Sequence, residues 1–330
     1  HRTGDGGEVS LGDWEGNTPF MPEPWMMLND GTLDYRLDPS DYTKKADGTA
    51  SDVANASYNG NAMMVWREPV FWKCTLEDQV AHYQFSNVKL DEGFECWNAK
   101  KHDGTYGMFA IGIYPATGSS SKTRSISSGG KPLTSTTATV ELAAANANGE
   151  GWYPTTLPDI QLMRLLGLLV FKRTDMQSAL GTRYVNGETS TASMAAVGSL
   201  NNKGMFYGEG WDGNSNSTVG TKFFGFENFW GEVNNRIIGA TINAGKYLIK
   251  LTPSGIDGTT GGFVTDDSAA AYAGYLDAKE ETAFGYGEWA SRGAYGALVN
   301  WVTANSILPE SAASSTTDLN APLDDRGLTR

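Results

Sequence analysis

The residue types that most often carry catalysis are scarce in this chain. The three histidines, His1, His82 and His102, all lie in its first third, and its two cysteines are Cys74 and Cys96. A Ser-His-Asp or Cys-His arrangement needs a histidine beside the nucleophile, so the second half of the chain cannot build one by itself. No pair of these residues has the close spacing of a zinc site, and we expect no metal and no cofactor.

Carboxylates are the remaining candidates for acid–base chemistry. Glu209, Asp212, Glu227 and Glu232 lie close together in the sequence, and a glycosidase needs only two carboxyl groups at a fixed separation. Because the chain holds 38 acidic residues, such a group arises readily by chance. A polysaccharide-degrading enzyme is therefore the least favoured hypothesis, and we expect the protein not to be an enzyme.

Charge and hydropathy restrict the partners. The chain has 25 basic and 38 acidic residues and a net charge of −13, which argues against nucleic-acid binding because that affinity depends on Lys and Arg. The longest apolar stretch, Leu165–Phe171, is far shorter than the roughly 20 residues that cross a bilayer. We expect no membrane partner. We expect no signal peptide at the start of the given sequence, and His1 in place of Met suggests that residues are missing or were removed upstream.

The first 150 residues divide by composition. Residues 1–61 are rich in Gly, Asp, Asn and Pro with little periodicity, which predicts an extended arm that docks on another protein, or alternatively an irregular lid. Residues 62–117 predict a small antiparallel β domain, and 118–150 a linker rich in Ser, Thr, Gly and Ala. The strands expected in the β domain are Met63–Trp66, Val70–Cys74, Val80–Phe85 and Met108–Tyr114. Cys74 and Cys96 are too few for a disulfide framework, which leaves two buried thiols or one bridge.

Residues 151–330 predict a second domain built around one apolar helix. The helix begins near Thr156, where Thr156 and Asp159 have the spacing of a capping box. Its apolar residues cover most of its circumference, so we expect it to be buried on several sides. The strands expected after it are Lys222–Phe226, Lys246–Leu251 and Gly296–Val302. The fold class expected for the whole chain is α+β, loop-rich, with antiparallel sheets.

An aromatic segment, Thr221–Trp230, predicts a tight buried corner. It carries five large rings around a Gly and an Asn, and the Asn amide can bind the backbone of the turn. The core residues expected there are Phe224, Phe226, Asn228, Phe229 and Trp230.

The same segment carries a resemblance to a known family. Its aromatic-Gly-x-Glu-Asn-x-Trp-Gly run, residues 224–231, resembles the central motif of tailed-phage virion proteins whose C-terminal half is similar to the C-type-lectin and formylglycine-enzyme fold. Further blocks match in family order over roughly residues 30–260: 34–42, 47–53, 58–64, 172–181 and 202–208. The resemblance implies a C-type-lectin-like domain over 151–330. The family's last strands are missing from the sequence, so either the chain is truncated or another subunit completes its sheet.

The sequence departs from the family's functional motifs, so the resemblance implies less about chemistry than about fold. The oxidase chemistry of the formylglycine enzymes needs cysteines in the lectin-like domain, but Cys74 and Cys96 both precede it. The Glu-Pro-Asn and Trp-Asn-Asp motifs of calcium-dependent lectins are also absent. Any glycan binding is therefore expected to be independent of calcium.

The segment 284–301 alternates aromatic residues with glycines, a composition typical of binding surfaces. The receptor-binding candidates are Tyr286, Trp289, Arg292 and Tyr295. We therefore expect a nonenzymatic phage virion protein, assembled in the host cytoplasm and exposed on the particle, that binds a host-surface glycan or protein. The alternative is an architectural capsid decoration or head-fibre component. Other virion proteins are expected partners, and the chain is expected to form a homo-oligomer.

Overall fold

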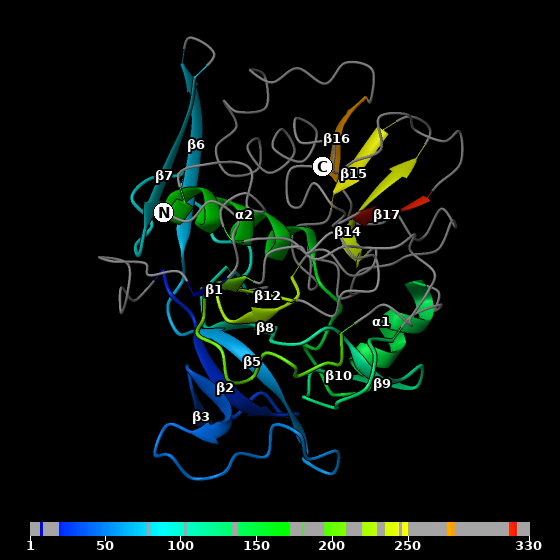
Figure 1. Ribbon diagram of the computed structural model, residues 1–330. Helices are drawn as coiled ribbons and strands as arrows, with labels where there is room; N and C mark the ends of the chain where they lie inside the picture. Colours follow the sequence, from blue (N-terminus) through cyan, green and yellow to red (C-terminus); the bar gives the residue numbers. More distant parts are fainter. Residues whose placement is uncertain are drawn as a thin grey trace.

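The structure is a computed structural model, and it describes part of the chain. The described residues are 7–8, 20–77, 80–101, 104–133, 138–171, 180, 195–208, 220–229, 235–243, 246–249, 276–280 and 317–321. Within them the protein is mixed, with antiparallel sheets and few helices (Figure 1). None of the described helices is both long and apolar enough to pass through a bilayer.

The largest sheet has five strands in the order β4-β3-β2-β5-β8. Every residue of β5 is buried, which fits its nearly unbroken apolar sequence Ala-Met-Met-Val-Trp. A strand covered on both faces needs apolar side chains in both directions. The bounds are β2 Glu23–Leu28, β3 Leu33–Asp38, β4 Asp41–Lys45, β5 Gly60–Trp66 and β8 Phe109–Gly112.

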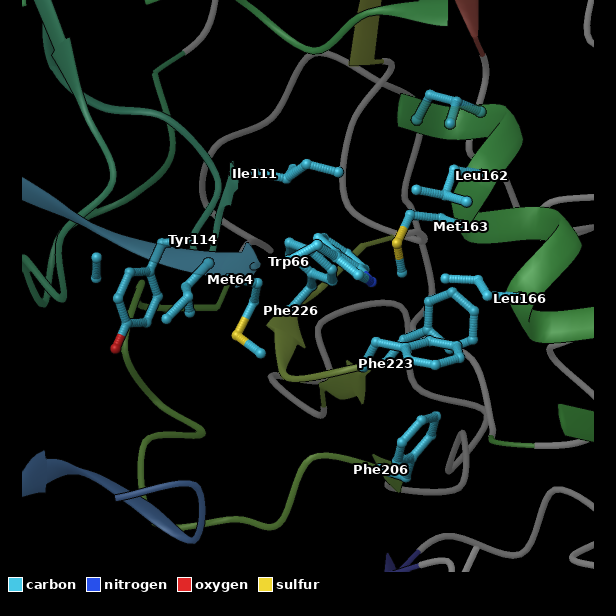
Figure 2. Close-up of a cluster of buried hydrophobic side chains, with 14 of the residues drawn as sticks. Met64, Trp66, Ile111, Tyr114, Leu162, Met163, Leu166, Phe206, Phe223 and Phe226 are labelled. Atoms are coloured by element: carbon cyan, nitrogen blue, oxygen red, sulfur yellow. The ribbon is translucent and has the colours of Figure 1, made fainter. Parts of the chain in front are cut away.

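Helix α2, Leu157–Phe171, packs over this sheet and closes the main core. Figure 2 shows Leu162, Met163 and Leu166 of α2 pointing toward Trp66 of β5, with Phe226 beside the indole. The same cluster of buried side chains includes residues from Met26 to Phe226. One continuous core therefore joins segments that are about 200 positions apart in the sequence.

The remaining elements are short or lie at the periphery. Strands β6 and β7 form a two-stranded hairpin that packs on the core through Trp72, Tyr83 and Phe85, and β9 and β10 form another beside α1 (Figure 1). Two further sheets have the orders β1-β11-β12-β13 and β16-β15-β14-β17. The bounds are β1 Gly7–Glu8, β6 Phe71–Glu77, β7 Val80–Ser86, β9 Thr117–Ser119, β10 Lys122–Arg124, α1 Ala138–Asn146, β11 Tyr207–Gly208, β12 Thr221–Phe223, β13 Phe226–Glu227, β14 Asn235–Asn243, β15 Lys246–Ile249, β16 Leu276–Glu280 and β17 Thr317–Ala321.

The helix and most of the expected strands are confirmed. Helix α2 begins where the capping box predicted, and β5, β6, β7, β8 and β15 each overlap an expected strand. The expected strand Lys222–Phe226 is wrong, because the chain reverses at Phe224 and Gly225 to form the hairpin of β12 and β13. The expected strand Gly296–Val302 lies outside the described residues.

Local structure differs from the expectation in two places before α2. The segment expected as an extended arm supplies β2, β3 and β4, and Met26, Leu37 and Tyr42 are fully buried there. The linker expected over 118–150 contains most of β9, all of β10 and helix α1. Both segments are polar because tight turns, rich in Asp, Asn and Gly, separate very short elements. The division of the chain into domains stays a prediction.

Candidate functional site

The aromatic corner is a two-residue β-hairpin. Phe223 of β12 pairs with Phe226 of β13, and the loop residues Phe224 and Gly225 have φ values of 51° and 82°. A type I′ turn requires positive φ at both loop positions, which glycine adopts freely and phenylalanine does not. Phe224 is fully buried, so packing of its ring stabilises a backbone conformation that is otherwise unfavourable.

Asn228 closes the corner in the way the sequence suggested. The backbone N–H of Thr221 donates to its Oδ1 at 3.1 Å, and its own backbone N–H donates to the Thr221 carbonyl at 2.8 Å. Asn228 is buried and has a φ of 50°, a conformation that asparagine tolerates better than most residues. Phe226 is also buried, and Phe229 packs partly buried against the same core. Trp230 lies outside the described residues.

Tyr42 and Lys222 attach the corner to the first sheet. The Tyr42 hydroxyl donates to the Gly225 carbonyl at 3.0 Å. The Lys222 ammonium lies 3.5 Å from the centroid of the Tyr42 ring and donates to the Lys203 carbonyl at 2.7 Å. Burial, together with the nearby charge of Glu227, raises the pKa of Tyr42. The corner is thus a structural centre, in which the side chains of Lys222, Glu227 and Asn228 are bonded inside the protein, whereas the buried Thr221 hydroxyl has no partner among the described residues.

The Glu227 carboxylate accepts hydrogen bonds from backbone N–H groups and is not placed for acid–base chemistry. Its carboxylate accepts the backbone N–H groups of Gly198 at 2.7 Å and Leu200 at 3.0 Å, and the residue is 2% exposed. A substrate has no access to a carboxylate enclosed in this way. Its three expected companions lie outside the described residues: Glu209, Asp212 and Glu232.

The other sequence candidates are dispersed or lie beyond the described parts of the chain. His82 is exposed on β7, whereas Cys96 is a buried free thiol whose pKa burial raises to about 12. Among the described residues no group of His, Cys, Asp and Glu side chains has the arrangement of a metal site. The receptor-binding candidates all lie outside the described residues: Tyr286, Trp289, Arg292 and Tyr295.

The described residues enclose a different candidate site, which we name the aromatic cleft. Its volume is about 550 Å³, and three segments form its walls: 97–101, 108–112 and 150–159. Its aromatic lining consists of Trp97, Trp152, Tyr153 and Phe109, each partly buried. The volume lies within the range of roughly 300–1,000 Å³ that is usual for small-ligand sites.

Two glycines and a backbone hydrogen bond fix the position of Trp152. Gly149 and Gly151 have φ values of 145° and 84°, and a Cβ on Gly149 would lie 2.7 Å from the Asn29 carbonyl oxygen. The Trp152 Nε1–H donates to that same carbonyl at 2.8 Å. The turn therefore presses close to the β2–β3 connection and brings the indole into the wall of the cleft.

Asp159 connects two walls of the cleft. Its Oδ1 accepts from Asn98 Nδ2 at 2.6 Å, and its Oδ2 accepts from the Thr156 backbone N–H at 2.9 Å. The Asp159 backbone N–H donates to Thr156 Oγ1 at 3.3 Å, which completes the capping box. Burial raises the pKa of Asp159, against the opposing effect of these hydrogen bonds. The residue lines the cleft and keeps some accessible surface.

A charged network supports the opposite wall. Lys100 Nζ donates to Glu95 at 2.6 Å and lies 4.9 Å from the centroid of the Trp97 ring. The Tyr106 hydroxyl also donates to the Glu95 carboxylate. Burial disfavours the charged form of Glu95, but these hydrogen bonds outweigh it and hold the pKa of Glu95 below its ordinary value. The Trp97 Nε1–H is buried and finds no hydrogen-bond partner among the described residues.

A smaller cavity of about 240 Å³ adjoins the cleft and shares Trp152 and Tyr153 with it. Arg124 lines this cavity, and its guanidinium donates to the carbonyls of Tyr58 at 2.7 Å and Gly60 at 2.5 Å. These bonds tie β10 to the start of β5. The Arg124 guanidinium, which is the charged donor of this cavity, therefore stabilises the fold through these bonds.

The sequence reasoning identified Asp159 only as a helix cap and missed the rest of the cleft. The sequence feature that could have indicated the cleft is the pair Trp152-Tyr153. It follows Gly149 and Gly151 and precedes the helix cap at Thr156. Glycines around paired aromatic residues mark a turn that displays rings, but nothing in the sequence connects this turn to Trp97.

Comparison of the chain with protein-family models and with curated proteins finds no match. The resemblance to tailed-phage virion proteins therefore rests on the sequence motifs alone.

Proposed function

We propose that the chain is a nonenzymatic structural protein of a tailed-phage virion that binds the host surface. The order of the sequence blocks and the C-type-lectin-like motif at 224–231 support the virion assignment. The aromatic cleft is the observation that supports recognition, because it offers partly accessible rings beside polar groups. Other virion proteins and further copies of the chain are the proposed assembly partners, and the particle surface is the proposed location.

An architectural capsid or head-fibre role is the second candidate, and the β6–β7 hairpin favours it. Within the described residues this ribbon pairs with no further strand apart from an isolated bridge between Trp72 and Glu95. Unpaired strand edges readily accept a strand from another subunit. This hairpin therefore offers an edge through which neighbouring subunits of a shell or fibre can join (Figure 1).

A binding experiment with host cells distinguishes these roles. The purified full-length chain, fluorescently labelled, is incubated with host cells, and antibodies against it locate it on the purified particle by electron microscopy. Attachment to cells and a position at the tail or on fibres support the receptor-binding role. Labelling of the capsid face with no cell attachment favours the architectural role, and absence from the particle contradicts both.

A further inference from the structure

We propose that the aromatic cleft is a carbohydrate-binding site for a short oligosaccharide. The inference rests on the proposed function, because it names the ligand class and the place at which the protein recognises the host surface. It also transfers recognition from the segment 284–301, which the sequence favoured, to residues 97–159.

The rings of the cleft suit the apolar faces of sugars. Trp152 and Tyr153 come from one wall and Trp97 from another, and all three are partly buried. The face of an aromatic ring carries partial negative charge, which attracts the weakly positive C–H groups on one side of a pyranose. Rings already held by the fold lose little conformational freedom on binding. Trp152 is held in this way by its bond to the Asn29 carbonyl.

The polar groups of the cleft suit sugar hydroxyls. Asp159 uses one bond on each carboxylate oxygen, while a carboxylate has about four acceptor sites, so acceptor capacity remains. Lys101 and Glu150 are exposed at the rim, and Lys101 makes no ion pair with the described residues. The rim thus offers one donor group and one acceptor group, which matches hydroxyls that both donate and accept.

Concavity and composition favour a glycan over a protein partner. A stable protein interface usually buries about 800 Å² on each side around an apolar centre. Among the described residues only Val88, Leu90 and Met108 are large hydrophobic side chains with high exposure, and of these only Met108 borders the cleft. A hollow of about 550 Å³ instead accommodates a compact ligand.

The test uses the full-length protein and oligosaccharides released from the host envelope by mild acid, separated by size. Titration calorimetry measures their affinity for the wild-type chain and for Tyr153→Ala, Lys101→Ala and Glu150→Ala. We expect Tyr153→Ala to weaken binding by at least about tenfold, as loss of a hot-spot ring does, and the two rim variants to weaken it less. Lys44→Ala and Leu90→Ala are matched controls, since both residues are exposed away from the cleft. Thermal melts verify that each variant folds.

The outcomes separate this inference from the proposed function. Unchanged oligosaccharide affinity in all three cleft variants overturns the inference, as does a wild-type chain that binds none of the fractions. If that chain still attaches to host cells, the proposed function survives and the site lies elsewhere. Loss of oligosaccharide binding in the cleft variants supports the inference. If the wild-type chain binds oligosaccharides but does not attach to cells, the inference stands and the proposed attachment role is contradicted. Cleavage of the oligosaccharides during titration contradicts a binding-only site.

Discussion

Single residues at the aromatic corner show how side chains support an unusual backbone. Phe224 and Asn228 are the non-glycine residues with positive φ among those described, and both are buried. A left-handed conformation costs roughly 1–2 kcal/mol for an ordinary residue. At each of these two positions a local contact must therefore offset this cost. For Phe224 the contact is the core, and for Asn228 it is the hydrogen bond to Thr221.

Replacing Asn228 tests this interpretation. We predict that Asn228→Ala lowers the free energy of unfolding by about 2–4 kcal/mol, because it leaves the Thr221 N–H unpaired and keeps an unfavourable φ. Asn228→Gly loses the same bond but accepts the φ, so it should be more stable than the alanine variant by about 1 kcal/mol. Denaturant unfolding of the full chain measures both values. Equal stability of the two variants would show that backbone strain contributes nothing there.

Glu95 gives the fold a predicted sensitivity to acid. Its pKa is lower in the folded protein than in the unfolded chain, so its stabilising contribution is fully present above the unfolded value of about 4.3. That contribution is lost as the pH falls through the folded pKa. We predict that Glu95→Gln makes the free energy of unfolding less dependent on pH between about pH 5 and pH 2. Chemical denaturation at a series of pH values measures this slope.

Secondary-structure elements were predictable where one local signal determines them. The capping box and the apolar circumference of α2 are both contained within about fifteen consecutive residues. The apolar run of β5 predicts a buried strand in the same way. Strands β2 to β4 were missed because their burial alternates and tight Asp-rich turns interrupt them, so composition indicated an irregular arm. Strand β5 lies beyond those turns, and its pairing with β2 is one that no local pattern contains.

The capping box of α2 should contribute measurably to stability. We predict that Thr156→Ala costs about 1 kcal/mol, the usual effect of removing a cap, because the Asp159 N–H loses its acceptor. Thr156→Ser keeps the hydroxyl and should cost far less. Thermal melts compare the two variants, and an alanine variant as stable as the serine variant would contradict the role of the cap.

The molecule as a whole explains why its candidate site could not be predicted. The corner residues are contiguous, so the sequence indicated both the buried rings and the role of Asn228. The cleft requires residues 97–101, 108–112 and 150–159 to converge, and their convergence depends on α2 and β8 packing in one core. Sequence patterns report periodicity within a segment, whereas this site depends on contacts between segments.

The shared core leads to a prediction about the halves of the chain. Trp66 and Ile111 from the first 150 residues are buried against Leu162 and Phe223 from the rest. Burial of each such side chain contributes roughly 1.5–3 kcal/mol, so separating the halves removes much of the stability of a fold that is marginal overall. We predict that the fragment 151–330 alone shows no cooperative thermal transition, whereas the full chain does. Circular dichroism melts of the fragment 151–330, the fragment 1–150 and their mixture test this. A cooperative transition of the isolated 151–330 fragment at the temperature of the full chain would establish that it is an independent domain, as the sequence alone predicts. Recovery of a transition only in the mixture would show that the core forms from both halves.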